Sequence, residues 1–172
     1  MSLLPGVVNS YNVYKGANKL IGISGEIELP ELEAITDTLE GAGVSGEIDI
    51  PVTGQFSSMK IKIKFTVLQE DLFDLMDTTD PTQLTLRGAM QGLDQNTSRA
   101  EYYPVKIVLR GKATTTSLGK LEKGKKGEPE IELELLYIKI LINNKTRLEL
   151  DKLNFKFVLN GVDMLAKIRS MI

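Results

Sequence analysis

The sequence predicts a mainly β protein, folded as a β-sandwich or partial barrel with one flanking α-helix and a short C-terminal helix. The first reason is the alternation of apolar and polar residues in many short segments, of which residues 57–67 are the clearest. The second is that clusters of Gly, Asn and Pro separate these segments, as turns do. The third is the resulting tally of about eight or nine strands against one or two short helices.

The N-terminal segment is predicted to be extended. Residues 1–10 are apolar but contain Pro5 and Gly6, which suits an extended arm better than a helix. Strands are predicted over residues 11–14 and 19–29, on either side of a short turn.

Residues 32–40 fit two kinds of secondary structure. Leu32, Ile35 and Leu39 lie at helical spacing, whereas the β-branched residues among them favour a strand. Because a glycine-rich segment and another alternating segment follow, we predict a long hairpin with a glycine-rich tip over residues 30–52.

An amphipathic strand and the best helix candidate come next. Lys60, Lys62 and Lys64 occupy the polar positions of the strand at 57–67. Residues 69–78 predict a helix, because their apolar side chains form one stripe and two acidic residues stand in the first turn.

The second half of the chain predicts mostly strands. We expect strands over 84–91, 102–115 and 131–140, with a solvated lysine-rich loop at 120–127.

The C-terminal residues alternate again at 148–150 and 155–157, and the turn signal Asn160-Gly161 follows. Asp163 is then predicted to cap a short helix. The apolar face expected for this helix consists of Leu165, Ile168 and Met171.

Composition indicates a folded building block with little catalytic chemistry. A single domain over residues 1–172 is expected, with 42% hydrophobic and 26% charged residues. The net charge of −2 gives no overall attraction to nucleic acid or anionic lipid. With no Cys and no His, the chain has no thiolate nucleophile, no Cys-based zinc site and no imidazole base. We predict no catalytic residue, no cofactor site and no metal site.

The N-terminus lacks the basic and apolar regions of a signal peptide. No apolar run reaches the roughly 20 residues that a membrane helix needs. We therefore expect a soluble product, made in the cytoplasm and without a membrane anchor.

Residues 41–46 match the glycine spacing of a dinucleotide-binding loop. That chemistry requires a helix to begin at the glycines, so that its amides meet a pyrophosphate. A strand pattern follows here instead, so a flexible hairpin tip is the better interpretation.

Charged residues gather on single strand faces. Glu130, Glu132 and Glu134 share one face, and Glu47 and Asp49 share another. Without a histidine or a second motif nearby, both faces are better explained as polar surface than as acid–base or metal sites. The lysines at 60, 62 and 64 favour a face that meets water or an acidic neighbour, because no aromatic residues interleave with them to stack on bases.

The order of segments resembles the major tail tube proteins of contractile-tailed bacteriophages and phage-tail-like bacteriocins. The resemblance spans nearly the whole chain, and no single motif carries it. Its ordered elements are Leu29-Pro30-Glu31-Leu32 leading to residues 40–46, Leu109-Arg110-Gly111, the charged loop before the strand with Tyr137, and the ending Asn160-Gly161-Val162-Asp163-Met164-Leu165.

The resemblance implies hexameric rings that stack into a hollow tube, with each subunit lending strands to a continuous inner β-barrel. It implies that the arm at 1–10 and the hairpin at 30–52 contact neighbouring subunits. The candidate inter-subunit contacts are Leu3, Leu4, Ile35, Leu39, Gly41, Gly43 and Val44.

The resemblance also implies a tube inside a contractile sheath that crosses a target envelope on contraction, with DNA passing through the lumen of a phage. Implied partners are the sheath, baseplate and tape-measure proteins, and the implied location is a virion or tail-like particle assembled in the bacterial cytoplasm. The candidate lumen-facing residues are Glu47, Asp49, Lys60, Lys62 and Lys64. If the lysines point inward, we expect the acidic faces to balance them, so that the lumen repels phosphates.

Other classes of function stay open at this point. The nearest alternative is the ring-forming tube protein of a type VI secretion system, and the next is a monomeric β-sandwich binding module. An enzyme is the least favoured class, since it would have to work with Asp, Glu, Lys, Ser and Tyr alone.

Overall fold

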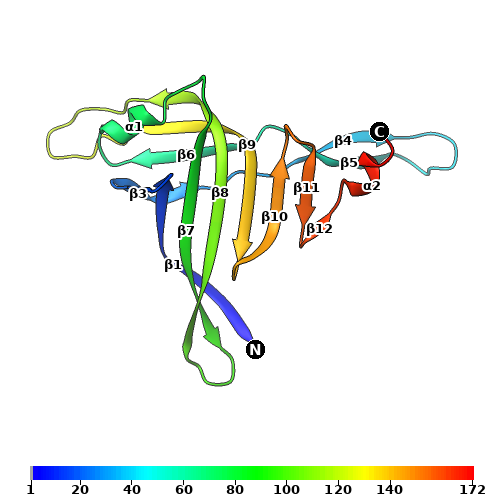
Figure 1. The fold of residues 1–172 in the computed structure, drawn as a ribbon, viewed down its shortest axis with the longest axis horizontal. Helices are drawn as coiled ribbons and strands as arrows, with labels where there is room; N and C mark the ends of the chain where they lie inside the picture. The colour runs from blue at the N-terminus through cyan, green and yellow to red at the C-terminus, as the bar shows by residue number, and fades with distance from the viewer. Residues whose placement is uncertain (1) are drawn as a thin grey trace.

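The computed structural model describes residues 2–172, which form a mainly β structure with two short helices (Figure 1). In chain order the elements are β1 Leu3–Lys15, β2 Asn18–Leu20, β3 Ile23–Glu28, β4 Ala34–Leu39, β5 Ile48–Phe56, β6 Lys60–Phe65, α1 Glu70–Asp74, β7 Thr82–Asp94, β8 Ala100–Ser117, β9 Glu130–Ile142, β10 Lys145–Asp151, β11 Lys156–Leu159, β12 Val162–Asp163 and α2 Ala166–Arg169.

Ten strands form one antiparallel sheet that forks at β9. Its main path runs β12-β11-β10-β9-β8-β7-β1-β2. The first half of β9 pairs with β6, which continues to β3, whereas the second half pairs with β10. Figure 1 shows β9 bending between these two partners, so that β3 and β6 run crosswise to the long strands. Strands β4 and β5 pair only with each other and form a separate hairpin.

The bend of β9 coincides with a bulge opposite Gly111. The register between β8 and β9 shifts between Arg110 and Gly111, and the residues buried along β9 change phase after Leu135. A Cβ at Gly111 would lie 2.3 Å from the carbonyl oxygen of Glu134, so only glycine allows the two backbones to approach this closely.

The hydrophobic core lies where the β3–β6 branch crosses the long strands. Ile61, Ile63 and Phe65 of β6, with Met59 just before the strand, point into this core. The lysines between them face outward, as the alternation at 57–67 predicted. The long strands contribute Val13, Leu84, Leu86, Ile107, Leu109, Leu133, Leu135 and Ile138. One face of the long strands is therefore packed and the other is uncovered.

Two predicted N-terminal elements have different bounds. Residues 3–10 are extended as expected, but they belong to β1 and pair with β7 along their whole length. The single strand predicted at 19–29 is wrong. Gly22, with φ of +80°, interrupts it and separates β2 from β3.

The hairpin predicted at 30–52 is confirmed in type, and its second strand continues to Phe56. The helix predicted at 69–78 is much shorter, since α1 ends at Asp74. The side chain of Asp77 accepts hydrogen bonds from the backbone amides of Thr79 and Asp80, which stabilises a turn in place of further helix. Leu72 is buried as the stripe requires, but Phe73 is exposed.

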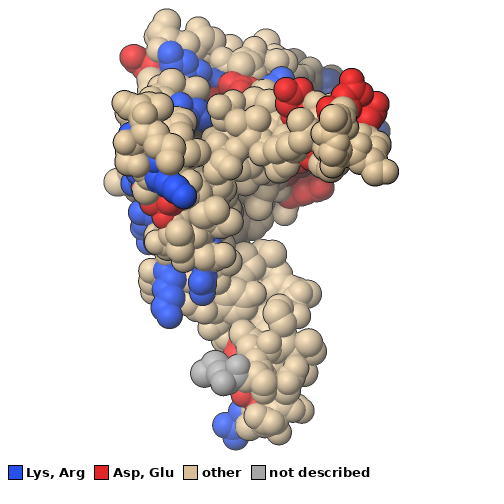
Figure 2. Space-filling view, turned by 90° about the vertical axis from the view of Figure 1, so that its right-hand side faces the viewer, with Lys and Arg blue, Asp and Glu red and all other residues tan. Residues whose placement is uncertain are grey.

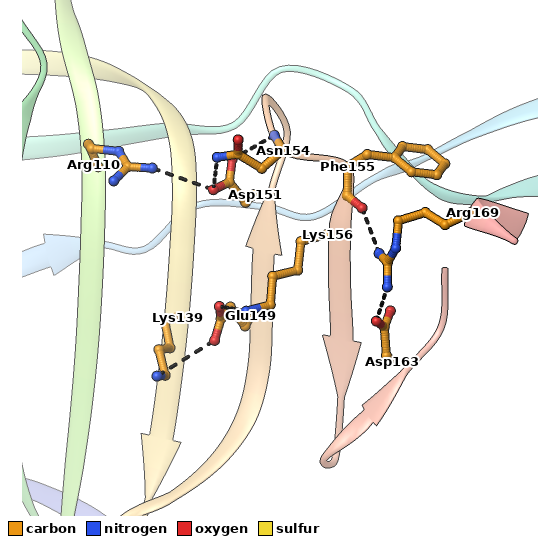
Figure 3. Close-up of polar contacts among 9 residues, drawn as sticks. All are labelled: Arg110, Lys139, Glu149, Asp151, Asn154, Phe155, Lys156, Asp163 and Arg169. Carbon is orange, nitrogen blue, oxygen red and sulfur yellow. Dashed lines mark hydrogen bonds and ion pairs between the residues drawn. The ribbon is translucent and has the colours of Figure 1, made fainter. Parts of the chain in front are cut away.

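The C-terminal helix is also short. Asp163 lies in β12, where its carboxylate accepts the amide of Leu165 and pairs with the side chain of Arg169, so it stabilises the entry to α2 from outside the helix (Figure 3). Leu165 is buried and Ile168 packs against the core, but Met171 is exposed, contrary to the predicted apolar face.

Candidate functional site

The first notable surface is a ladder of opposite charges on the outer side of the branch. Lys60, Lys62 and Lys64 of β6 lie opposite Glu134, Glu132 and Glu130 of β9 in the pairing register. The ion pairs are Lys60 Nζ–Glu132 Oε1 at 3.5 Å, Lys62 Nζ–Glu132 Oε2 at 3.8 Å and Lys64 Nζ–Glu130 Oε2 at 3.9 Å. The glutamates therefore neutralise the lysine face, and we call this set the Lys–Glu ladder.

The second surface is the uncovered face of the long strands, shown in part in Figure 3. On this face Lys139 Nζ and Lys156 Nζ lie 3.6 and 2.6 Å from the two oxygens of Glu149. Arg110 Nη2 lies 3.5 Å from Asp151 Oδ2. Side chains from four strands, β8 to β11, thus form two neighbouring groups of ion pairs, which together we call the polar network.

Asp151 is the buried anion of this network. Desolvation by burial raises its pKa, but hydrogen bonds from the side chain and amide of Asn154 and from the amide of Leu153, together with the charge of Arg110, lower it more. The pKa of Asp151 therefore lies below its usual value, and the side chain holds the turn between β10 and β11 as a carboxylate.

Two arginines on the uncovered face stack on tyrosines. The guanidinium of Arg110 lies 4.9 Å from the ring centre of Tyr137, and that of Arg87 lies 5.6 Å from the ring of Tyr14. Burial, followed by the charge of Glu149, raises the pKa of Tyr137 and keeps it neutral. These contacts fix long cationic side chains flat on the sheet.

The uncovered face carries more positive than negative charge. Lys106 lies directly opposite Arg87 in the β7–β8 register, and neither has a carboxylate within ion-pair distance among the described residues. The basic members are Arg87, Lys106, Arg110, Lys139 and Lys156, against Glu149 and Asp151. In the view of Figure 2 most lysine and arginine side chains lie on the left, with a few acidic side chains among them, and most acidic side chains lie at the upper right.

Sequence reasoning missed this surface. The sequence did contain a signal for it, because Lys106, Val108 and Arg110 alternate along β8 with the buried residues Ile107 and Leu109.

The third surface is the hairpin of β4, β5 and the tip at 40–47, which we call the ribbon. Leu39 lies opposite Ile48 and Asp37 opposite Ile50, so these side chains share one face of the ribbon. Thr38 lies on the other face, where its hydroxyl donates to Asp49 at 2.9 Å. One face is thus predominantly apolar and the other polar.

Within residues 2–172, the ribbon contacts the body at its base. There the ring of Phe56 packs edge-on against that of Phe157, with 5.2 Å between the ring centroids. Gly54 lies beneath the side chain of Leu165. The remainder projects away from the sheet, as Figure 1 shows at the right. The apolar residues Ile35, Leu39, Ile48 and Ile50 are each about half exposed, with Ile48 at 50%.

The fourth surface is an apolar groove of about 280 Å³ beside β1 and β3, which we call the groove. Its walls come from Val8 and Tyr11 of β1, Ile27 of β3, Met90 of β7 and Val105 of β8, among others. The hydroxyl of Tyr11 donates to the carbonyl of Ser24 at 2.9 Å and joins the two walls. Burial raises the pKa of Tyr11, and the nearby Glu26 raises it further.

The sheet also ends in two incompletely paired edges. Strand β1 pairs with β7 on one side, but β2 covers only Val13 to Lys15 on the other. At the opposite end of the sheet, β12 covers only Val158 and Leu159 of β11. The amide of Met164 also donates to the carbonyl of Phe157, so β11 is largely covered and the terminal strand on this side is β12. Most of β1 and the outer side of β12 can therefore accept a further strand.

The structure separates the residues that the sequence proposed as one lumen-facing set. Glu47 and Asp49 lie on the ribbon, away from the Lys–Glu ladder, so only Glu130 to Glu134 balance the lysines. Of the expected inter-subunit contacts, Leu3 and Leu4 lie on β1, Ile35 and Leu39 on β4, and Gly41, Gly43 and Val44 at the ribbon tip.

Among the described residues, no three acidic side chains are arranged to hold a metal ion. No helix within residues 2–172 is long and apolar enough to span a membrane.

Comparison with known proteins identifies the family. The family model described as Phage tail tube protein FII matches residues 5–172. The chain belongs to this family. It is accordingly a structural tail tube protein, a component of a phage tail and not an enzyme.

One curated protein and one solved structure are similar to this chain. The tail tube protein of Escherichia phage P2 is 22% identical over 167 residues, which is 96% of each chain. A chain in the sheath–tube complex of an extracellular contractile injection system, PVC, in the extended state has a similar fold. Its TM-score is 0.54 at 15% identity, covering 80% of this chain and 91% of that chain.

Proposed function

We propose that this tail tube protein assembles into hexameric rings that stack as the inner tube of a contractile tail. The observation that carries the proposal is the pair of incompletely paired sheet edges, on β1 and on β12, at opposite ends of one long sheet. Joining such edges between copies satisfies their backbone groups and closes the sheets of several copies into a barrel. Each subunit is then a β-sandwich or partial barrel that contributes strands to the inner barrel of the tube.

The uncovered face suits the lumen of this tube better than the Lys–Glu ladder does. It belongs to the long strands that continue from edge to edge, whereas the ladder lies on a branch that ends at the short strand β3. In this arrangement the ladder faces outward. The assignment of the uncovered face to the lumen is an alternative to the lumen-facing residues predicted from the sequence. Those residues, which stay a prediction, are Lys60, Lys62, Lys64, Glu47 and Asp49.

The sheath is the partner that the comparison with a sheath–tube complex suggests for the outer surface. Contraction of a sheath would drive the tube as a rigid body through a target envelope. Baseplate and tape-measure proteins complete the proposed set of partners, and DNA passes through the lumen if the particle is a phage. A lumen lined by the uncovered face carries net positive charge and attracts phosphates, which differs from the phosphate-repelling lumen expected from the sequence. The particle is then a virion or a tail-like bacteriocin assembled in the bacterial cytoplasm.

Negative-stain electron microscopy and sedimentation velocity of the purified chain test the assembly. We expect rings with sixfold symmetry or hollow tubes, with a fast-sedimenting species that grows with protein concentration. A chain that stays monomeric at high concentration, even with baseplate and tape-measure proteins present as a nucleus, would rule the proposal out.

A further inference from the structure

The apolar face of the ribbon lacks a cover within the described chain. A two-stranded hairpin is marginally stable in water unless its apolar face packs against something. Here Ile48 and Ile50 stay about half exposed, and only the base of the ribbon contacts the body through Phe56 and Gly54. A surface of this kind is typical of a segment that is completed by a partner.

The groove is the complementary feature of the same chain. Its walls are almost entirely apolar, with Glu26 as the charged residue that lines it. Val8 and Leu29 stand at the groove and are 58% and 51% exposed. The groove is therefore an apolar concave surface, and the apolar side chains of the ribbon can fill it.

The two surfaces cannot meet within one molecule. The ribbon projects on the side of β10 to β12, whereas β1 and β3, which form the groove, lie on the other side (Figure 1). A protruding surface on one side and a receiving surface on the other generate a head-to-tail contact that repeats from copy to copy.

The free sheet edges lie on the same two sides. The edge of β1 is on the groove side and the edge of β12 is on the ribbon side. One placement of a second copy can therefore join the edges and bring the ribbon toward the groove together. Two independent features thus favour the same neighbour.

We infer that the ribbon of one copy lies across the next copy and seats its apolar face, around Ile48 and Ile50, in the groove formed by β1, β3, β7 and β8. This inference rests on the proposed assembly and names the receiving surface. The polar face, with Thr38 and Asp49, stays directed away from the groove.

Disulfide trapping tests the contact. Because the chain has no cysteine, any disulfide must join the introduced residues. We would combine Ile50→Cys with Val8→Cys in one chain and oxidise the assembled protein. Both positions are exposed in the single subunit, so the substitutions should leave the fold intact. We expect a ladder of covalent oligomers on a denaturing gel that a reducing agent removes.

The matched control combines Thr38→Cys with Val8→Cys, because Thr38 lies on the opposite face of the same ribbon. We expect this pair, and each single variant, to give no ladder. A second measurement uses Ile50→Asp, which should abolish ring formation, with Thr38→Asp as the variant that should preserve it. Circular dichroism of both variants checks that the subunit is folded.

The outcomes separate the two proposals. Two results would overturn the seating of the ribbon and leave the proposed tube intact. In the first, the Ile50→Cys/Val8→Cys variant assembles into tubes but gives no ladder of covalent oligomers. In the second, Ile50→Asp assembles like wild type. An equal ladder from the Thr38/Val8 pair overturns the assignment of the apolar face. A wild-type chain that forms neither rings nor a ladder contradicts the proposed assembly itself.

Discussion

At Gly111 the absence of a side chain allows the sheet to fork. The backbone of β8 approaches the carbonyl of Glu134 so closely that a methyl group would lie 2.3 Å from it. The bulge at this point changes the direction of β9 and lets one strand serve both β6 and β10. A single residue thus separates the branch over the core from the uncovered face.

Gly111→Ala should lower the free energy of unfolding by about 1–3 kcal/mol, because the backbone must shift to admit the methyl group. Chemical denaturation followed by circular dichroism measures the loss. Gly25→Ala is the control, since a Cβ at Gly25 meets no atom within 4 Å, and it should change stability by less than about 0.5 kcal/mol. Equal effects of the two variants would contradict the role given to Gly111.

The carboxyl group of Asp151 makes the free energy of unfolding depend on pH. Its folded pKa lies below the unfolded value near 3.8, so its contribution is complete above that value and is lost as the pH falls through the folded pKa. Asp151→Asn should therefore be less stable than wild type at about pH 6, and the difference should shrink at about pH 3. Denaturation midpoints at the two pH values measure this. A difference that is independent of pH would show that the carboxylate charge contributes nothing.

At the scale of elements, the Lys–Glu ladder joins the branch to the long sheet. Lys62→Glu places two carboxylates directly opposite each other at Glu132 and should cost up to about 1 kcal/mol. The double variant Lys62→Glu/Glu132→Lys should restore most of the loss, and added salt should reduce it. Lys123→Glu, in the exposed loop, is the control and should be nearly neutral. A double variant no more stable than the single one would contradict cross-strand pairing.

The strands were more predictable than the helices. Alternation located β6, β8 and β9 because burial of every second residue is a local property of a strand with one packed face. The helix predicted at 69–78 shortened to α1, because the Asp77 turn competes with helix continuation. The ribbon was predicted from its glycines and β-branched residues, yet its projection away from the core depends on contacts that no local pattern encodes.

At the scale of the whole molecule, the surplus of positive charge on the uncovered face affects assembly. If this face lines a lumen, the cations of neighbouring copies face one another across it, and Lys106 has no carboxylate partner among the described residues. Their repulsion opposes ring closure and weakens as salt shortens the Debye length.

Tube formation should therefore increase as salt is raised from about 0.01 M to 0.15 M, where the Debye length falls from about 30 to 8 Å. Lys106→Gln should assemble at lower salt than wild type, whereas Lys123→Gln in the exposed loop should not differ. Light scattering with electron microscopy of the same samples measures the shift. If both variants assemble like wild type at every salt concentration, the uncovered face does not line the lumen.

The sequence by itself determined the mainly β fold class, the lack of cysteine and histidine side chains, and the ordered resemblance to tail tube proteins. These properties depend on composition and on neighbours along the chain. Tertiary structure alone decided that Glu130 to Glu134 balance the lysines, that Glu47 and Asp49 lie elsewhere, and that Arg87, Lys106 and Lys139 share an uncovered face. These are properties of pairing between strands distant in sequence, and the register that fixes them is set by the bulge at Gly111 and the packing of the core.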